Sequence, residues 1–312
     1  MTKRTTQVAL SSTATSIKAR LANLARSNGQ EFNHILTRYS LERFLFRLVA
    51  VSQDFILKGA ALYHLSQQWA PRPTKDLDLL RRKPASIPDL EEIVRQACCV
   101  PCPGDGTIFD PESVVGEFIR EEIGAVAGGV RINLKGNLGQ AILSVQLDIG
   151  FGEAMVPPPF EAEYPCLLPG MPAAKILAYR WETSIAEKVE AMVKHDVANS
   201  RMKDFFDIWE LSNTMVFVAS DLREAIAATF VECRRPLPKA LPFGLTDEFA
   251  TMPEKQAQWS GWRWRFKPID VPENLQGVIC RVRDFLGPIL LDELPPVARW
   301  NPSGGWEIRK NS

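Results

Sequence analysis

The residues of this chain best suited to chemistry are two aspartates that stand two positions apart, Asp76 and Asp78. Side chains along an extended strand alternate between faces, so both carboxylates are expected on one face and the leucine between them on the other. Hard divalent cations prefer oxygen ligands, and a pair of such ions can hold the attacking and leaving oxygens of a phosphoryl or nucleotidyl transfer. The spacing therefore suits metal-dependent phosphoryl chemistry, although by itself it is as typical of a solvated edge strand.

The segment before these aspartates favours the phosphoryl interpretation. Residues 54–60 form a short apolar stretch that runs into a tight turn at Gly59, and residues 60–65 favour the opening of a helix. Backbone N–H groups at such a turn can bind phosphate oxygens. A glycine, a small residue, a helix and then a strand with two aspartates form the core of the polymerase-beta-like nucleotidyltransferase pattern, which this chain resembles.

Four segments in order make the resemblance more specific: together they look like the nucleotidyltransferase AbiEii/AbiGii toxin family. They are residues 55–60, 72–78, 187–191 and 199–209. One such motif is a weak signal, whereas four with matching order and spacing, over roughly residues 41–211, are a strong one. The departure is Ala60, where the family usually has a second glycine or a serine. The alanine leaves a backbone cradle in place but removes a hydroxyl that could touch a phosphate.

The resemblance implies an α+β fold, with a polymerase-beta-like nucleotidyltransferase core (a mixed sheet flanked by helices) and a mostly helical C-terminal domain. We predict a helical N-terminal preface at residues 1–40, the core at 41–165 and the C-terminal domain at 166–312. The second boundary is placed where three consecutive prolines, residues 157–159, and an irregular stretch interrupt the chain.

Hydrophobic periodicity predicts the individual elements. Helices are expected at residues 16–25, 32–51, 87–96, 222–233 and 275–285, and strands at 117–123, 129–134 and 141–149. From Ala173 onward the pattern is mostly helical, and the tail at 295–312 is expected to be loose. The Trp-rich and Arg-rich segment 259–265 leaves two interpretations: a surface that stacks and neutralises single-stranded RNA, or a packed loop or short strand, which we favour.

The predicted strand 141–149 supplies a third candidate carboxylate. Its apolar residues alternate onto one face, which leaves Asp148 on the other. Polymerase-beta-like enzymes take a third acid from a later strand, either as a metal ligand or as a base for the attacking hydroxyl. The alternative is a solvated aspartate at the end of a strand.

The second half of the chain places a lysine and an aspartate beside apolar stripes. Lys188 adjoins the stripe of helix 184–197, and Asp204 aligns with the core positions of the next helix, where Arg201 or Lys188 could pair with it. The resemblance makes Lys188 an active-site residue that reaches the triphosphate across a domain cleft, and it includes Asp204 in the catalytic constellation with Asp207 in support. The alternatives are a lysine that snorkels to solvent and, for Asp207, an aspartate favoured by the helix macrodipole alone.

These inferences define the candidate site. The predicted catalytic residues are Asp76, Asp78, Asp148, Lys188 and Asp204; the first three are predicted ligands of Mg²⁺ (or Mn²⁺), and the residues expected to bind the NTP substrate are Lys58, Gly59, Ala60, Arg72, Thr74 and Arg201.

Composition limits the other function classes. Lys plus Arg and Asp plus Glu are 37 each, so any contact with a polynucleotide must come from a local patch, for example at residues 81–83. No apolar run approaches the ~20 residues of a membrane span, and no secretory signal is visible, so no membrane contact and a cytoplasmic location are expected. The six cysteines do not suggest a disulfide framework, and the single C-x-x-C at Cys99 and Cys102 is weak evidence of a zinc or redox site.

The sequence thus predicts a Mg-dependent nucleotidyltransferase toxin that transfers a nucleotide from an NTP to an acceptor. The resemblance implies a type IV-like toxin–antitoxin or abortive-infection system, growth arrest and a separately encoded antitoxin. The expected acceptor is tRNA or another RNA, with a protein acceptor left open. The alternative is a non-catalytic nucleotide-binding or partner-binding module that retains the fold. A DNA-binding regulator is disfavoured because no helix-turn-helix or basic domain is visible.

Overall fold

The structure, a computed structural model, describes residues 2–66, 74–119, 128–152, 155–268 and 270–308. The chain divides into two compact units. The first comprises Met1–Gln67, Pro73–Ala154 and Phe160–Ala178, and the second Gln68–Arg72, Met155–Pro159 and Tyr179–Ser312. The domain limits expected from the sequence, 1–40, 41–165 and 166–312, stay a prediction.

The first unit is built on a seven-stranded mixed sheet with the strand order β3-β4-β5-β2-β1-β7-β6. The strands are β1 (Phe55–Lys58), β2 (Leu77–Arg81), β3 (Thr107–Ile119), β4 (Gly129–Leu138), β5 (Ala141–Phe151), β6 (Phe160–Tyr164) and β7 (Ala174–Ala178). β2 runs parallel to β5, and β1 runs parallel to β7, while the remaining neighbours are antiparallel. The predicted α+β fold with a mixed sheet flanked by helices is confirmed.

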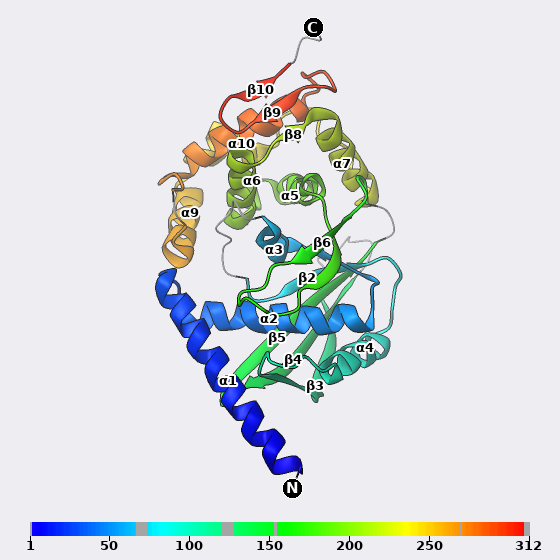
Figure 1. Cartoon of the computed structure of the whole chain (residues 1–312). Coiled ribbons are helices and arrows are strands. Elements are labelled where there is room, and N and C mark those ends of the chain that lie inside the picture. The colour runs from blue at the N-terminus through cyan, green and yellow to red at the C-terminus, as the bar shows by residue number, and fades with distance from the viewer. Residues whose placement is uncertain (1, 67–73, 120–127, 153–154, 269, 309–312) are drawn as a thin grey trace. The chain divides into compact units, whose positions relative to one another are not determined.

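Helices of the first unit pack on this sheet and on one another (Figure 1). They are α1 (Thr2–Ser27), α2 (Phe32–Val51), α3 (Gly59–Leu62), which continues into the 3-10 helix η1 (Tyr63–Leu65), and α4 (Ile87–Cys99). α2 packs on β5, β7 and α4, and α4 packs on β3. The predicted helix at residues 32–51 is confirmed, and most of it is buried. α4 begins with a capping box, in which the Ser86 side chain accepts from the Asp89 N–H and Asp89 accepts in return.

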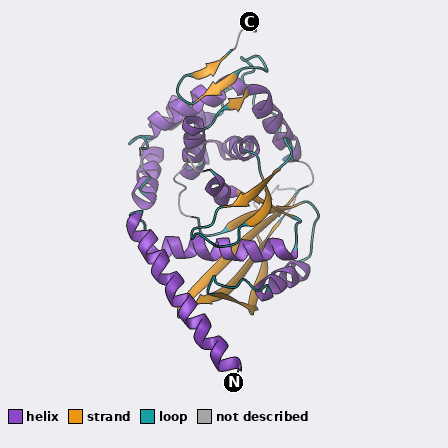
Figure 2. Cartoon of the chain, viewed as in Figure 1, coloured by secondary structure: helices purple, strands orange, loops and turns teal. Residues whose placement is uncertain are grey.

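The second unit is mostly helical (Figure 2). Its helices are α5 (Trp181–His195), α6 (Met202–Thr214), α7 (Ala219–Glu232), α8 (Asp247–Thr251), α9 (Pro253–Phe266) and α10 (Leu275–Leu290), with 3-10 helices η2 (Asp196–Ala198) and η3 (Phe243–Leu245). Three short strands, β8 (Phe217–Val218), β9 (Arg299–Asn301) and β10 (Gly305–Glu307), form a small antiparallel sheet. Among the described residues, no helix is both long and apolar enough to cross a membrane.

Of two predictions about the second half of the chain, one is confirmed and one is wrong. Residues from Ala173 were expected to be mostly helical, and they are. An exception is strand β7 (Ala174–Ala178), where pairing with β1 and β6 outweighs the helix propensity of Ala, Lys and Leu. The tail was expected to be loose, but it contains β9 and β10. Trp300 is fully buried there, donates from Nε1 to the Ser212 carbonyl at 2.7 Å and packs on Phe285, so long-range burial orders this segment.

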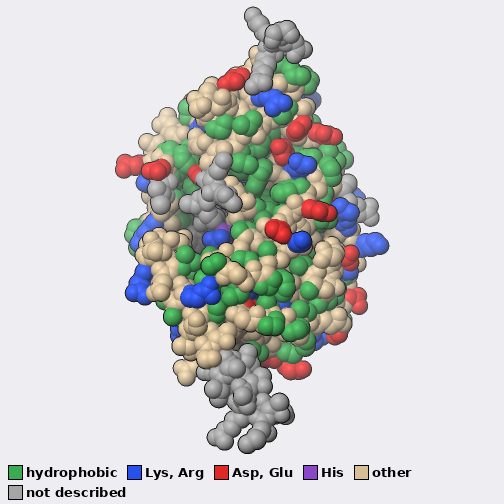
Figure 3. Space-filling model, in the orientation of Figure 1, with side chains coloured by type: hydrophobic (Ala, Val, Ile, Leu, Met, Phe, Trp, Pro, Cys, Tyr) green, Lys and Arg blue, Asp and Glu red, His purple; other side chains and the backbone are tan. Residues whose placement is uncertain are grey.

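Two further predictions concern element type and limits. Residues 259–265, favoured as a packed loop or short strand, lie within helix α9. The strand expected at 117–123 is part of β3, which begins earlier, at Thr107; residues 120–123 lie outside the described residues. On the face seen in Figure 3, acidic and basic side chains are interspersed, in keeping with equal numbers of each in the sequence.

A buried ion pair ties α2 to the loop before β3. Arg47 Nη1 lies 2.7 Å from Asp105 Oδ2, and both side chains are almost fully buried. Asp105 Oδ1 accepts from the Thr107 N–H at 2.9 Å, and the Tyr39 hydroxyl donates to the Asp105 carbonyl oxygen at 2.8 Å. Buried charges are tolerated when they are paired and hydrogen-bonded, which this network provides.

We predict that Asp105→Ala lowers the free energy of unfolding by about 3–5 kcal/mol, because it leaves Arg47 buried without its counter-charge. The matched control is Glu163→Ala in the same unit. It removes an exposed ion pair in which Lys175 Nζ lies 3.7 Å from Glu163 Oε1. An exposed pair contributes under about 1 kcal/mol. Urea unfolding followed by circular dichroism compares the two variants; equal midpoints would contradict the assignment.

Candidate functional site

Strand pairing aligns four polar residues in one row across the sheet of the first unit. Lys58 pairs with Asp78, Asp78 with Asp148, and Asp148 with Arg131. Directly opposed residues on neighbouring strands point to the same face. The leucines and isoleucine that flank the two aspartates are fully buried on the other face; they are Leu77, Leu79, Leu147 and Ile149. The structure therefore brings Asp78 and Asp148 together on the face away from the apolar core.

Gly59 follows β1 directly and lies against Asp78. Its φ is +64°, in the left-handed region that glycine adopts without strain. A Cβ added to Gly59 would lie 2.5 Å from the Cβ and the Cγ of Asp78, and still closer to Oδ2. Any side chain at this position would thus displace the Asp78 carboxylate, and only glycine allows the backbone to approach it this closely.

Asp76 lies just before β2, which begins at Leu77, so it is not within the strand as the alternation predicted. The hydroxyl of the buried Thr74 donates to Asp76 Oδ1 at 3.0 Å and lies 3.2 Å from the Asp76 carbonyl oxygen. Such side-chain bonds to nearby backbone groups compete with strand pairing. Thr74 therefore orients the first carboxylate; Arg72, another predicted substrate ligand, lies outside the described residues.

Asp148 is held by an arginine that the sequence did not single out. Arg131 donates from Nε to Oδ1 at 2.8 Å and from Nη2 to Oδ2 at 2.7 Å, a bidentate geometry, and Gln146 Nε2 donates to Oδ1 at 3.1 Å. The hydrogen bond to Asp148 raises the pKa of Arg131, with further contributions from the charges of Asp148, Glu117 and Asp76 against a cost of burial. The two oxygens of the third candidate carboxylate are thus engaged by protein groups.

All three candidate carboxylates have the oxygen donors that suit Mg²⁺ or Mn²⁺, and both oxygens of Asp148 already accept hydrogen bonds from Arg131 and Gln146. Carboxylate oxygens are the donors that these cations prefer, and Gly59 adds no side chain to the space beside Asp78. Within the described residues, no group of three or more His, Cys, Asp or Glu lies close enough to hold a metal ion together. Cys99 and Cys102 are free thiols.

A polar hollow of about 490 Å³ adjoins the carboxylate row. It is lined by Lys75, Ser113, Val115, Asn133, Leu134, Lys135, Ser144, Val145 and Gln146. Lys75 precedes Asp76 in the chain, and Gln146 bonds to Asp148, so two of the lining residues are direct neighbours of candidate carboxylates. Two lysines and several hydroxyl and amide groups suit a polar, anionic ligand.

The other candidate residues form a cluster of charges in the second unit. Lys188 Nζ, from α5, lies 3.3 Å from Asp204 Oδ1 and 3.1 Å from Asp207 Oδ2, both from α6. Arg201 Nε also pairs with Asp204 Oδ2. The sequence left open whether Arg201 or Lys188 pairs with Asp204, and both do. Asp207 is fully buried and paired with Lys188. The alternative, an aspartate favoured by the helix macrodipole alone, requires no such partner.

Opposing effects set the ionisation of Asp204. Burial is the largest influence and by itself would raise the pKa of Asp204, but the charges of Lys188 and Arg201 together outweigh it and hold this pKa below its ordinary value of 3.8. Asp204 therefore stays ionised at neutral pH despite being almost fully buried. A buried carboxylate between two cations is a rigid element that fixes the lysine ammonium in place.

A mixed sheet that carries carboxylates beside a glycine turn defines a nucleotidyltransferase fold. The chain belongs to the nucleotidyl transferase AbiEii toxin family of type IV toxin–antitoxin systems, whose family model matches residues 43–276. The resemblance seen in the sequence is thereby confirmed. A type IV system implies a separate antitoxin.

Two solved structures from Helicobacter pylori are similar to this chain. One is described as a candidate nucleotidyltransferase: it shares 15% identity, with 83% of this chain and 97% of that chain covered and a TM-score of 0.44. The other, JHP933, shares 14% identity, with 81% and 89% covered and a TM-score of 0.42. At these values the likeness adds nothing to the argument about chemistry. A comparison with curated proteins finds no significant match.

We predict that Gly59→Ala destabilises the protein more than Gly29→Ala. Both glycines have a φ of +64°, but nothing lies within 4 Å of a Cβ added to Gly29, whereas one added to Gly59 overlaps Asp78. Gly29→Ala therefore reports the backbone strain alone, about 1–2 kcal/mol, and the excess in Gly59→Ala reports the collision. Urea unfolding of both variants measures the difference, and equal losses would show that Asp78 can move away at no cost.

We predict that Asp204 makes stability fall at acidic pH. Because its pKa is lower in the folded than in the unfolded chain, its stabilising contribution is present above the unfolded value and is lost as pH falls through the folded one. Unfolding free energies measured by urea at a series of pH values below 4 should fall less steeply in Asp204→Asn than in the original protein. An identical slope would show that Asp204 does not titrate in this way.

Proposed function

We propose that this AbiEii-family protein uses Mg²⁺ (or Mn²⁺) to transfer a nucleotide from an NTP to an acceptor hydroxyl. The observation that carries the proposal is the contact between Gly59 and Asp78, in which a backbone turn without a side chain lies directly against a carboxylate on a strand. A triphosphate needs both partners at once, because backbone N–H groups bind its oxygens while a carboxylate holds the metal that they share.

The donor phosphates are proposed to lie over Gly59 and Ala60, with Lys58 nearby as a cation. Asp76 and Asp78 would hold Mg²⁺, which when bound supplies positive charge for the phosphate oxygens and orients them for in-line displacement. Thr74 supports this arrangement by fixing the Asp76 carboxylate. Arg72 remains a proposed phosphate ligand on the strength of the family resemblance alone.

The acceptor is proposed to approach from the opposite side of Asp78. In the strand order, Gly59 follows β1 on one side of β2, while Asp148 and the polar hollow lie on β5, β4 and β3 on the other. Asp148 would then face the attacking hydroxyl, and Arg131 would keep its carboxylate oriented. Lys75 and Lys135 line the hollow, which supports an anionic acceptor, and we propose an RNA, with tRNA as the leading candidate.

The charge cluster of the second unit is proposed to serve the same reaction. On the strength of the family resemblance alone, Lys188 is proposed to contribute positive charge toward the triphosphate. Asp204 and Asp207 hold its ammonium at 3.3 Å and 3.1 Å. A lysine fixed in this way loses little side-chain entropy on binding a phosphate. Arg201, whose side chain is more exposed, is proposed as a further substrate contact.

A cytoplasmic toxin with a separately encoded antitoxin fits this chemistry. NTP substrates are found in the cytoplasm, and all six cysteines are free thiols, as in proteins kept in a reducing compartment. The antitoxin need not bind the toxin directly.

A second candidate function is a nucleotide-binding or partner-binding module without catalysis. The observation in its favour is the bidentate pair of Arg131 and Asp148, which engages both oxygens of the third carboxylate. Such a module would bind an NTP but would not transfer a nucleotide from it.

We predict that Asp78→Ala lowers nucleotidyl transfer by about 10³-fold or more and removes toxicity, because it deletes a proposed metal ligand. The assay incubates the protein with each α-labelled NTP, Mg²⁺ and total RNA or cell extract, and EDTA should abolish labelling. Glu163→Ala, far along the sheet on β6, should keep full activity.

The fate of the label separates the candidate functions. Label on RNA supports the proposal, and label on protein would replace the RNA acceptor by a protein. NTP binding without any transfer would support the non-catalytic module. Full transfer by a soluble Asp78→Ala protein would overturn the proposed role of this carboxylate.

A further inference from the structure

Helix α9 has two faces of opposite character. Trp259, Trp262 and Phe266 recur at the spacing of one helix face, and their rings pack on one another and on Phe206 of α6. The indole of Trp259 is fully buried and donates from Nε1 to the Pro272 carbonyl oxygen at 3.2 Å. This aromatic face anchors α9 rigidly within the second unit.

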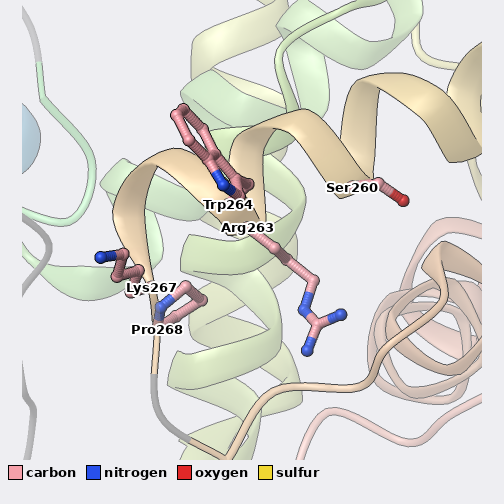
Figure 4. A pocket seen from close by; sticks show the side chains of 5 residues that line it. All are labelled: Ser260, Arg263, Trp264, Lys267 and Pro268. Atoms are coloured by element: carbon pink, nitrogen blue, oxygen red, sulfur yellow. The ribbon is translucent and has the colours of Figure 1, made fainter.

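The outward face of α9 presents a fourth aromatic ring among cations. Ser260, Arg263, Trp264 and Lys267 stand at i, i+3, i+4 and i+7, and together with Pro268 they line a hollow of about 280 Å³ (Figure 4). Trp264 is 81% exposed. Exposing an indole to this degree forgoes the stabilisation that burial of a large aromatic side chain brings.

The charges around Trp264 favour an anionic ligand. Arg263 and Lys267 line the hollow, whereas the nearest acidic residues in sequence are Asp270 and Glu273, beyond the end of the helix. Arg263 is held by a hydrogen bond from Nη1 to the Glu273 carbonyl oxygen at 3.2 Å, and its Nε is buried. One edge of the guanidinium is therefore fixed against the protein, which holds this cation in place beside the hollow.

A protein partner fits this surface less well than a nucleic acid does. A protein interface generally has an apolar centre, but Trp264 is the sole large hydrophobic side chain on α9 that is strongly exposed among the described residues. A single ring flanked by cations is instead the arrangement that binds single strands, in which a base stacks on the ring and the phosphates meet the cations.

We propose that Ser260, Arg263, Trp264 and Lys267 form a binding site for single-stranded RNA, in which a base stacks on the Trp264 indole and Arg263 and Lys267 contact the phosphates beside it. The proposal deepens the proposed function, since it names where an RNA acceptor is held, and it rests on that function for the purpose of the binding. The Ser260 hydroxyl can hydrogen-bond to a ribose or phosphate oxygen in the same hollow.

The test measures binding of a fluorescein-labelled single-stranded RNA of about 10 nucleotides by fluorescence anisotropy, with no NTP present. Trp264→Ala should weaken binding by about tenfold or more, because stacking on the ring is lost, whereas Trp264→Phe keeps a ring and should retain most of the affinity. Both variants should fold normally, since the side chain is exposed. Val231→Ala, which truncates a side chain on α7 that is 78% exposed, is the matched control and should bind as the original protein does.

The phosphate contact is tested by Lys267→Asn, because asparagine tolerates the left-handed conformation of this residue, φ +46°. Removing one phosphate contact should lower the slope of log affinity against log salt concentration by about 0.7. Lys239→Asn, at another exposed lysine of the same unit, should leave the slope unchanged.

Three results would overturn the inference: no RNA binding by the original protein, unchanged affinity in Trp264→Ala, which a protein interface predicts, or equal losses in Trp264→Ala and Trp264→Phe. Because binding is measured without NTP, the test is separate from the proposed reaction. Loss of transfer in Asp78→Ala with normal RNA binding by Trp264→Ala refutes only the site on α9. RNA binding that depends on Trp264, in a protein that transfers no nucleotide, refutes only the reaction.

Discussion

The candidate site depends on one steric constraint, the absence of a side chain at position 59. Because β1 is an interior strand of the sheet, with β2 on one side and β7 on the other, its end cannot shift without disturbing both neighbours. The pairing of Lys58 with Asp78 then brings the next residue, Gly59, directly against the carboxylate. Any Cβ there would move Asp78, and the parallel register with β5 ties Asp78 in turn to Asp148. The glycine turn and the two carboxylates are thus positioned by one set of strand pairings.

Local sequence patterns predicted much of the fold but not the strands formed by distant pairing. Apolar residues recur with a period of about 3.6 in segment 32–51 and of 2 in segment 141–149. The structure has a helix and a strand there, with bounds at or close to the predicted ones. β7 has no such period in its Ala-Lys-Ile-Leu-Ala sequence and becomes a strand only because β1 and β6 flank it. The tail is ordered for a similar reason, since Trp300 is buried against residues far away in sequence.

The site was predictable to the extent that its members carry motifs. Asp76, Asp78 and Gly59 stand within a short pattern, whereas Arg131 does not. A signal for Arg131 was nevertheless present: the two-residue turn between Leu138 and Ala141 fixes the hairpin register, and counting back from that turn pairs Arg131 with Asp148. The ion pairs of Lys188 with both aspartates of α6 could not be predicted by counting residues from a turn. They depend on how helices α5 and α6 pack on each other.

The segment Trp-Ser-Gly-Trp-Arg-Trp-Arg shows how an alternating sequence pattern can suggest the wrong element. Its last four residues alternate aromatic and basic with a period of two, which suggests a strand, yet the segment is helical. On a helix, positions 262 and 264 are about 200° apart, so Trp262 turns inward and Trp264 outward. The inward rings, Trp259 and Trp262, stack within the core and fix the helix, and that rigidity holds Trp264 in place with its side chain exposed to solvent. The same alternation therefore provides both an anchor and an exposed ring among cations.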